Sequence, residues 1–519
     1  HGLGTAYLHY PVYRLFGSNL ASSQLGREMI AALAPAFLFV ATFRLFVGRW
    51  RPAFALAALA IGLTFLLKLS AILFASNGMV GLRATLPTLI PAIAFAVRPA
   101  RARSALVGVG LGLALFLSTE QGLAICLAYG IVGVITAPRG PDRLAGFVET
   151  AATLAIAVAT FVIALICVGG VAGMMGALRY NLRLVPMDQY WYFGAPPNTF
   201  VPSWGAGVRM VFAVRLIGAA LGLAAALTIT YLVRLWLAPT EESRRRSFSL
   251  AFLASYGLIS CASLLGVFTP AYVQPCWRVL IIIGLVELAD FAARREPDRE
   301  WFGVPRGAAA AVIAGCLLTA IAIPLVPTSL SSLPHVVRDH VVRRVPFTAD
   351  SMWTTTLRDG QAELDRHRSA DGKPPVLWST YAGWLEARNG LFHPSFDYII
   401  HALGPDNRTA YVETLRAQRP ALVQTVLPTY TQYEAWLENN DWAFYDELLD
   451  WYTISGTTPW SIFWERRASR APQPAAFAAM QVPAGLMSVP LPPIPDSLAS
   501  PVMLLEVDVE YDVHNPLQG

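Results

Sequence analysis

Residues 104–137 read SALVGVGLGLALFLSTEQGLAICLAYGIVGVITA. Two apolar runs, 104–117 and 122–137, flank the short polar stretch 118–121. A bilayer core is crossed by about 20 residues, so the two runs together are too long for one crossing. They predict two membrane helices joined by a tight polar turn. The GVGLG at 108–112 lies inside an apolar run, which favours close helix packing over a dinucleotide-binding loop.

The same pattern extends in both directions from this stretch. Long apolar runs separated by short polar segments cover the first two thirds of the chain. They lie at about 28–47, 53–75, 80–97, 104–117, 122–137, 150–177, 207–237, 247–268, 272–292 and 307–327. The sequence therefore predicts an all-α multi-span membrane bundle of about ten spans over residues 1–328.

Composition agrees with this division. The 519 residues are 55% hydrophobic and only 14% charged, whereas soluble proteins carry about 25% charged residues. The deficit falls almost entirely before Pro327, and ordinary charge returns from Ser329 on. Residues 329–470 are predicted to form a water-soluble domain. Residues 471–519 are predicted to be a Pro/Ala linker and a partial β-rich segment, in which 503–511 alternates like the first strand of a β-sandwich.

Short strand-like and helix-like segments alternate in the soluble part. Strands are predicted at 375–379, 421–425 and 460–465, and helices at 408–418 and 433–449. Strands that alternate with helices predict a small α/β domain.

Arginine residues give the orientation of the chain. Basic clusters follow the first, third, fifth, seventh and ninth apolar runs, and the connections after the even-numbered runs are poor in positive charge apart from the one with Arg179 and Arg183. By the positive-inside rule the basic connections are cytoplasmic. The other connections and the α/β domain are then extracytoplasmic. Because the arginines cluster in these connections, the net charge of +5 does not indicate a nucleic-acid partner.

Several ionisable residues are predicted near the outer end of the spans. They are Lys68, Arg83, Glu120, Asp188, Arg209, Arg215 and Arg278. Ionisable groups at membrane depth are costly and usually line a cavity. The alternative is that each long side chain reaches the interface separately, by snorkelling. The group as a whole favours a shared polar cavity.

A cationic cavity open to the outer leaflet suits an anionic lipid, since arginine matches the geometry of a phosphate group. Arg278, Arg83, Lys68 and Arg209 are the candidate ligands of the lipid phosphate. A nearby carboxylate, Glu120 or Asp188, could serve as the general base for an acceptor hydroxyl. This combination predicts sugar transfer from a polyprenyl-phosphate donor to a glycan, lipid or protein acceptor.

The connection Leu178–Trp204 is long and aromatic, and it contains Asp188. It is predicted to cover the cavity, with Trp191 and Tyr192 as candidate contacts to the sugar. The alternative is an ordinary aromatic belt at the membrane interface, with Asp188 in solvent.

The layout resembles the GT-C superfamily of integral-membrane glycosyltransferases, which includes protein mannosyltransferases and aminoarabinose transferases. The lead-in HGLGTAYLHYPVYRLFGSN at 1–19, the turn at 118–122, the segment 270–278 and the stretch WSTYAGWLEARNGLFHPSFDYIIHALG at 378–404 carry the resemblance. It implies a bacterial inner-membrane enzyme of the cell envelope. The family's principal catalytic Asp lies in the first outer loop, so the resemblance also implies a fragment that starts after the first span.

Two other classes of function stay open. A transporter or flippase of a lipid-linked or anionic substrate would have charged groups spread through the membrane depth, and commonly two related halves. A non-catalytic anchor that presents a binding domain would have a closed, dry membrane part. No metal-ligand, nucleophile-elbow or phosphate-loop motif occurs in the sequence, and the participation of a divalent metal is left open.

Overall fold

The structure is a computed structural model of the chain. It describes residues 10–16, 36–66, 83, 85–137, 143–189, 215–265, 273–295, 300–301, 304–305, 354–380, 385–386, 389, 399–427 and 441–471. The chain divides into two compact units, His1–Ala468 and Ser469–Gly519. The predicted linker and strand at 471–511 lie almost wholly outside the described residues, and the predicted domain boundaries at 328 and 470 stay predictions.

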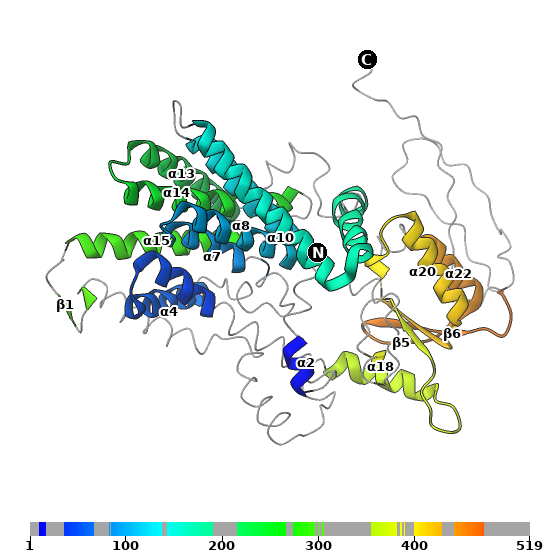
Figure 1. Cartoon of the computed structure of the whole chain (residues 1–519). Coiled ribbons are helices and arrows are strands. Elements are labelled where there is room, and N and C mark those ends of the chain that lie inside the picture. Colours follow the sequence, from blue (N-terminus) through cyan, green and yellow to red (C-terminus); the bar gives the residue numbers. More distant parts are fainter. Residues whose placement is uncertain are drawn as a thin grey trace, which may run out of the picture. The chain divides into compact units, whose positions relative to one another are not determined.

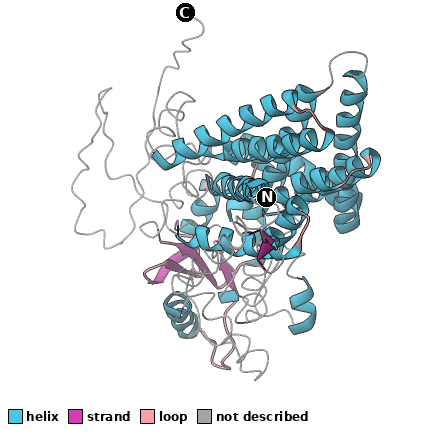
Figure 2. Cartoon of the chain, turned by 90° about the vertical axis from the view of Figure 1, so that its left-hand side faces the viewer, coloured by secondary structure: helices cyan, strands magenta, loops and turns pink. Residues whose placement is uncertain are grey.

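Apart from a short hairpin at 300–305, helices make up the regular elements in the described part of the predicted membrane domain (Figures 1 and 2). After the short α2 (Tyr10–Phe16) and an apolar helix Ala36–Val47, the described helices are α4 (Trp50–Leu66), α7 (Thr85–Ala96), α8 (Ala100–Leu117), α9 (Thr119–Thr136), α10 (Arg143–Arg179), α13 (Arg215–Leu237), α14 (Glu241–Ile259) and α15 (Gln274–Arg295). A π-helix, η1 (Tyr180–Gln189), continues α10, and a 3-10 helix, η2 (Ser260–Leu265), continues α14. α10 is kinked at Gly170, whose φ of 64° is readily adopted only by glycine.

The stretch 104–137 forms two helices, as predicted. α8 ends at Leu117 and α9 begins at Thr119, so a single residue, Ser118, separates them. The helices fold back against each other, because a Cβ atom on Gly122 would lie only 2.3 Å from the Leu115 Cα. The two runs are therefore a hairpin rather than one kinked segment.

Glycines of the GVGLG sequence are packing positions, also as predicted. A Cβ atom on Gly108 would lie 2.8 Å from Ile156 of α10, and one on Gly112 would lie 2.5 Å from the Ala157 carbonyl oxygen. Gly110 faces Ile90 of α7. α8 is therefore held between α7 and α10. Packing of the same kind is not seen at Gly222 in α13, where a Cβ atom would meet open space.

The bundle has the surface of a membrane protein. Four described helical segments are long and apolar enough to cross a bilayer: Ala100–Leu117, Thr119–Thr136, Leu144–Val185 and Gly218–Leu237. Large apolar side chains such as Leu127, Ile131 and Ile163 are exposed on these helices, where they would be costly in water and favourable in lipid. The chain is an integral membrane protein. The predicted count of ten spans stays a prediction, and the tenth run, 307–327, lies outside the described residues.

Helix boundaries differ from the predicted ones at the basic ends. α14 begins at Glu241, so Arg244, Arg245 and Arg246 lie in the helix and not in a connection. The Thr240 side chain accepts a hydrogen bond from the Ser243 N–H at 3.2 Å, and two glutamates occupy the first turn. This capping stabilises an early start that the hydropathy of the sequence does not show.

Residues 354–471 contain an α/β fold, in which strands and helices alternate where the chain is described. Its sheet has the order β3-β4-β6-β5, formed by β3 (Leu377–Ser379), β4 (Leu422–Val426), β6 (Ser461–Arg466) and β5 (Tyr452–Thr457). β3 and β4 are parallel, with Leu377 opposite Leu422, whereas β4–β6 and β6–β5 are antiparallel. The described helices are α18 (Thr354–Arg366), α20 (Pro405–Gln418) and α22 (Trp442–Trp451), with a 3-10 turn, η7 (Ile399–His401). β5 and α18 were not predicted. Outside this fold, the two-residue strands β1 (Glu300–Trp301) and β2 (Val304–Pro305) pair as an antiparallel hairpin.

An aromatic core joins the sheet to its helices. Trp378 of β3 donates from Nε1 to the Tyr411 hydroxyl of α20 at 2.9 Å, and Tyr411 packs edge-on against Phe444 of α22. These side chains and Trp464 belong to one buried cluster. Burial of such large side chains stabilises the domain by roughly 1.5–3 kcal/mol each.

Candidate functional site

Five polar side chains from four separate parts of the sequence come together at one end of the bundle. Arg83 lies just before α7, and Glu120 and Gln121 lie in the first turn of α9. Tyr256 lies near the end of α14, and Arg278 lies in the second turn of α15. We call these five residues the polar cluster.

The α8–α9 turn holds the acidic member of the polar cluster. Ser118 is the N-cap of α9, and its hydroxyl accepts a hydrogen bond from the Gln121 N–H at 3.4 Å. Glu120 follows in the first turn, where the positive end of the helix dipole favours a carboxylate. The backbone around Glu120 and Gln121 is therefore fixed by a cap and by the contact of Gly122 with Leu115.

Polar contacts connect four of the five residues of the polar cluster, one after another. The Tyr256 hydroxyl donates to Gln121 Oε1 at 2.8 Å, and Gln121 Nε2 donates to Glu120 Oε1 at 3.3 Å. Arg83 Nη1 lies 4.0 Å from Glu120 Oε2. The charges of Arg278 and Glu120 both act on Tyr256. The structure thus brings three of the predicted site residues, Arg83, Glu120 and Arg278, to the same place.

Exposure differs sharply within the polar cluster. Tyr256, Arg278 and Gln121 are 0%, 3% and 4% exposed, whereas the side chain of Glu120 is 38% exposed and that of Arg83 12%. A half-exposed carboxylate is therefore backed by buried polar groups. Arg278 is enclosed by protein, so it does not reach the interface by snorkelling.

The remaining predicted site residues are described only in part. Lys68, Arg209, Trp191 and Tyr192 lie outside the described residues. The backbone of Asp188 lies in η1, and the structure does not describe its side chain. Whether these residues join the polar cluster stays a prediction.

The predicted covering loop at 178–204 needs a correction. Its first half is helical, because η1 extends the helix of α10 from Tyr180 to Gln189. No glycine or proline occurs between Arg179 and Val185, so nothing in the local sequence stops the helix before Pro186. Of the described residues, the loop contributes a helical extension and not an irregular segment.

Ion pairs join neighbouring helices at the opposite end of the bundle. Arg103 of α8 lies 3.1 Å from Glu149 of α10, and Arg246 of α14 lies 3.2 Å from Asp290 of α15. Tyr231 of α13 donates to Glu287 at 3.2 Å. These pairs lie among the basic helix ends, and they provide controls of matched chemistry for the polar cluster.

Comparison with known proteins gives little further detail. No protein-family model matches the sequence, and no curated protein matches it. Among solved structures the chain is similar to ArnT from Cupriavidus metallidurans, whose crystal structure is bound to undecaprenyl phosphate. The similarity covers 90% of this chain and 88% of that one, at 13% identity and a TM-score of 0.42. A likeness of this size assigns neither residues nor a reaction to this chain.

Two residues of the polar cluster were not predicted. Tyr256 lies in the apolar run at 247–268, and Gln121 lies beside Glu120 in the predicted turn. A tyrosine in an apolar helix is most simply explained as core. Only the packing of α9 against α14 reveals that its hydroxyl faces Gln121. Among the described residues, no group of three His, Cys, Asp or Glu side chains is arranged to hold a metal ion.

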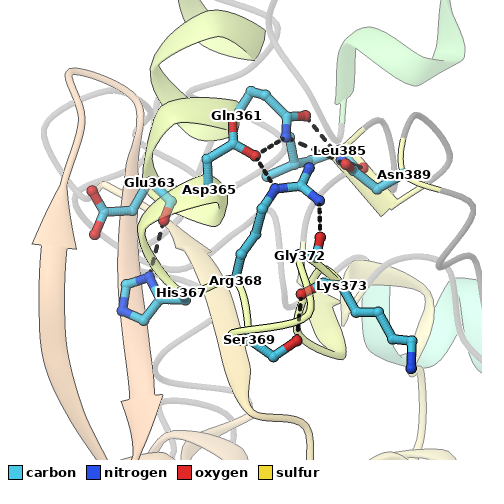
Figure 3. A network of polar contacts seen from close by, with 10 residues as sticks. All are labelled: Gln361, Glu363, Asp365, His367, Arg368, Ser369, Gly372, Lys373, Leu385 and Asn389. Carbon is cyan, nitrogen blue, oxygen red and sulfur yellow. Dashed lines mark hydrogen bonds and ion pairs between the residues drawn. The ribbon is translucent and has the colours of Figure 1, made fainter.

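A second polar network lies at the end of α18 in the α/β fold (Figure 3). The Arg368 guanidinium donates to the Asp365 carboxylate at 2.6 Å and to the Gly372 carbonyl oxygen at 2.8 Å. Hydrogen bonds from Lys373 and Ser369 lower the pKa of the exposed Asp371. These contacts join neighbouring residues and close the end of the helix. They indicate a structural turn and not a site of chemistry.

Proposed function

We propose that the chain is a membrane glycosyltransferase that moves a sugar from a polyprenyl-phosphate donor to a glycan, lipid or protein acceptor on the extracytoplasmic face. The observation that carries this proposal is the convergence of Arg83, Glu120 and Arg278 from three different parts of the sequence at one end of the bundle.

The roles follow from the chemistry of the side chains. The acceptor hydroxyl loses its proton to the Glu120 carboxylate and forms a bond to the anomeric carbon of the sugar. The bond from that carbon to the phosphate oxygen breaks, and polyprenyl phosphate leaves with an additional negative charge. Arg83 and Arg278 stabilise this charge electrostatically. Glu120 is the most exposed of these groups, which suits a base that meets the acceptor.

The distribution of charge favours this reaction over transport. In α8, α9 and α10 the charged side chains lie in the first or last turns or in the turn next to them, and the central turns of these described helices carry none. In α15, Glu287 lies further inside the helix, where it pairs with Arg234 at 3.4 Å. A transporter commonly places polar groups near the membrane midplane. A non-catalytic anchor does not require a half-exposed carboxylate that is held by a network of buried groups.

A comparison of two matched ion pairs tests the proposal. Glu120 and Glu149 have similarly exposed side chains, 38% and 40%, and each faces an arginine, Arg83 and Arg103 respectively. Membranes that contain the chain would be supplied with undecaprenyl-phosphate sugars that carry a hexose or a pentose, and release of undecaprenyl phosphate would be measured.

We expect Glu120→Gln to lower the rate by about 10²-fold or more, the usual contribution of a general base. Arg83→Ala should abolish transfer, whereas Glu149→Gln and Arg103→Ala should stay near the wild-type rate. Wild-type turnover in both Glu120→Gln and Arg83→Ala would contradict the assignment.

A further inference from the structure

Tyr256 and Gln121 form the buried side of the polar cluster. Tyr256 is fully buried and Gln121 nearly so, and neither residue has a role in the reaction proposed above. Their contact joins α14 to α9, two helices separated by more than a hundred residues of sequence. Such a hydrogen bond in a buried place is costly to leave unmade.

The direction of the hydrogen bonds is fixed by the chemistry of the groups. A glutamine amide presents one oxygen that accepts and one NH₂ group that donates. The Tyr256 hydroxyl donates to Oε1, so the NH₂ group points to the other side, where it donates to Glu120 Oε1 at 3.3 Å. With the amide reversed, its oxygen would face the carboxylate, and two acceptors would oppose each other. The charged carboxylate only accepts hydrogen bonds, so it selects this orientation of Gln121, and the Tyr256 hydroxyl holds it by donating to Oε1.

The two oxygens of Glu120 then have different surroundings. Oε1 accepts from the Gln121 amide, and Oε2 faces Arg83. The groups that hold the carboxylate are buried or nearly so, while the carboxylate itself is half-exposed. A carboxylate oriented by fixed groups in this way needs little reorganisation before it accepts a proton.

We propose that Tyr256 and Gln121 are positioning residues that orient Glu120 through the hydrogen-bond series Tyr256–Gln121–Glu120. Neither of them touches the substrate. Their effect on catalysis rests on the proposed function of Glu120, but the orientation of Glu120 can be measured without any reaction.

Tyr231 supplies the matched control. Like Tyr256, it is buried, at 2% exposed, and it belongs to a tyrosine–carboxylate–arginine group with Glu287 and Arg234. That group lies toward the opposite end of the bundle. There the Tyr231 hydroxyl donates directly to the Glu287 carboxylate, without a glutamine between them. Tyr231→Phe removes the same hydroxyl group from a comparable environment.

Two readouts separate positioning from a purely structural role. The first is the split between kcat and KM in the transfer assay. The second is modification of Glu120 by dicyclohexylcarbodiimide, which reacts with the protonated carboxyl group, measured by mass spectrometry relative to Glu149. Loss of a hydrogen bond donated to the charged form favours the neutral form, so disorientation should speed the labelling.

For Tyr256→Phe we expect a fall in kcat of about tenfold with little change in KM, and labelling of Glu120 several times faster than in the wild type. Tyr231→Phe should change neither quantity. If Tyr256→Phe fails to fold, Gln121→Met keeps the volume and removes the same donor to Glu120, and the same two results are expected.

The outcomes distinguish the two proposals. Faster Glu120 labelling in Tyr256→Phe, with no loss of transfer in Glu120→Gln, would support the positioning pair and overturn the proposed reaction. Loss of transfer in Glu120→Gln, with unchanged kcat and labelling in Tyr256→Phe, would overturn the positioning pair alone. An equal effect of Tyr231→Phe would also overturn it.

Discussion

A partly buried carboxylate at the edge of the sheet shows how a single residue couples the α/β fold to pH. Glu386 Oε1 accepts a hydrogen bond from the Ser379 N–H at 2.7 Å, and Ser379 ends β3, the edge strand of the sheet. Burial raises the pKa of Glu386 to about 7, against the smaller lowering effect of the Ser379 hydrogen bond. Glu386 therefore accepts a hydrogen bond from a backbone N–H of the edge strand. In return, its carboxyl group lies in an environment that disfavours the charged form.

The sign of the pH dependence follows from the raised pKa. The folded state holds the proton of Glu386 more tightly than the unfolded state, in which the pKa is about 4.3. The contribution of Glu386 to stability is then most favourable at low pH, and it is lost as the pH rises from about 4 through 7.

Hydrogen exchange at the Ser379 amide, corrected for the intrinsic rate, should therefore show protection that falls by up to about tenfold per pH unit between pH 5 and 7. Glu386→Gln should remove this dependence, whereas replacement of the exposed Glu413 by Gln should keep it. Protection in the wild type that does not change over this range would refute the prediction.

At the scale of elements, glycines decide which helices can touch. Gly122 brings the first turn of α9 against the end of α8, and a Cβ atom there would lie 2.3 Å from the Leu115 Cα and 2.4 Å from its nitrogen. These are backbone atoms, so the helices would have to separate. Gly173 of α10 is the contrasting case, since a Cβ atom there would meet nothing within 4 Å.

Gly122→Ala should accordingly destabilise the protein by about 1–3 kcal/mol, the usual cost of overpacking. Gly173→Ala should be neutral or stabilising by up to about 1 kcal/mol, because alanine is the better helix former. Unfolding in detergent, followed by circular dichroism, measures both. Equal midpoints for the two variants would show that the α8–α9 contact does not need a glycine.

Over the whole molecule, the two ends of the bundle have different chemistry. One end has the basic helix ends with ion pairs such as Arg103–Glu149 and Arg246–Asp290. The other has the polar cluster, where α7, α9 and α15 begin and α8 and α14 end. This arrangement supports the proposal that the basic end is cytoplasmic, because positively charged residues are retained on that side.

Cysteine labelling tests the orientation in intact bacterial cells. In a chain whose own cysteines have been replaced, Ala370→Cys in the α/β fold should react with a membrane-impermeant maleimide. Ala102→Cys at the start of α8 should react only after lysis. Both alanines are exposed, so the membrane and not burial decides the result. Labelling of Ala102→Cys in intact cells would show that the orientation is opposite to the proposed one.

Much of the fold could be predicted from the sequence, because the relevant signals are local. Hydropathy summed over a window places the helices of the hairpin at 104–137, and glycines within such a run indicate close packing. Short apolar segments between turn residues place β3, β4 and β6. The strand β5 was missed because its residues, Tyr452–Thr457, contain a glycine and polar side chains that pair only through the irregular register with β6.

The sequence alone determined that the chain is a membrane-embedded helical bundle with an α/β part. It also indicated seven charges near the outer ends of the spans, among them Arg83, Glu120 and Arg278. Only the tertiary structure decided that Arg83 faces Glu120, that Arg278 is buried near Tyr256, and that hydrogen bonds join Tyr256 to Gln121 and Gln121 to Glu120. The physical reason is that hydropathy depends on neighbours along the chain. The direction in which a side chain points depends on how each helix is rotated and packed against helices far away in the sequence.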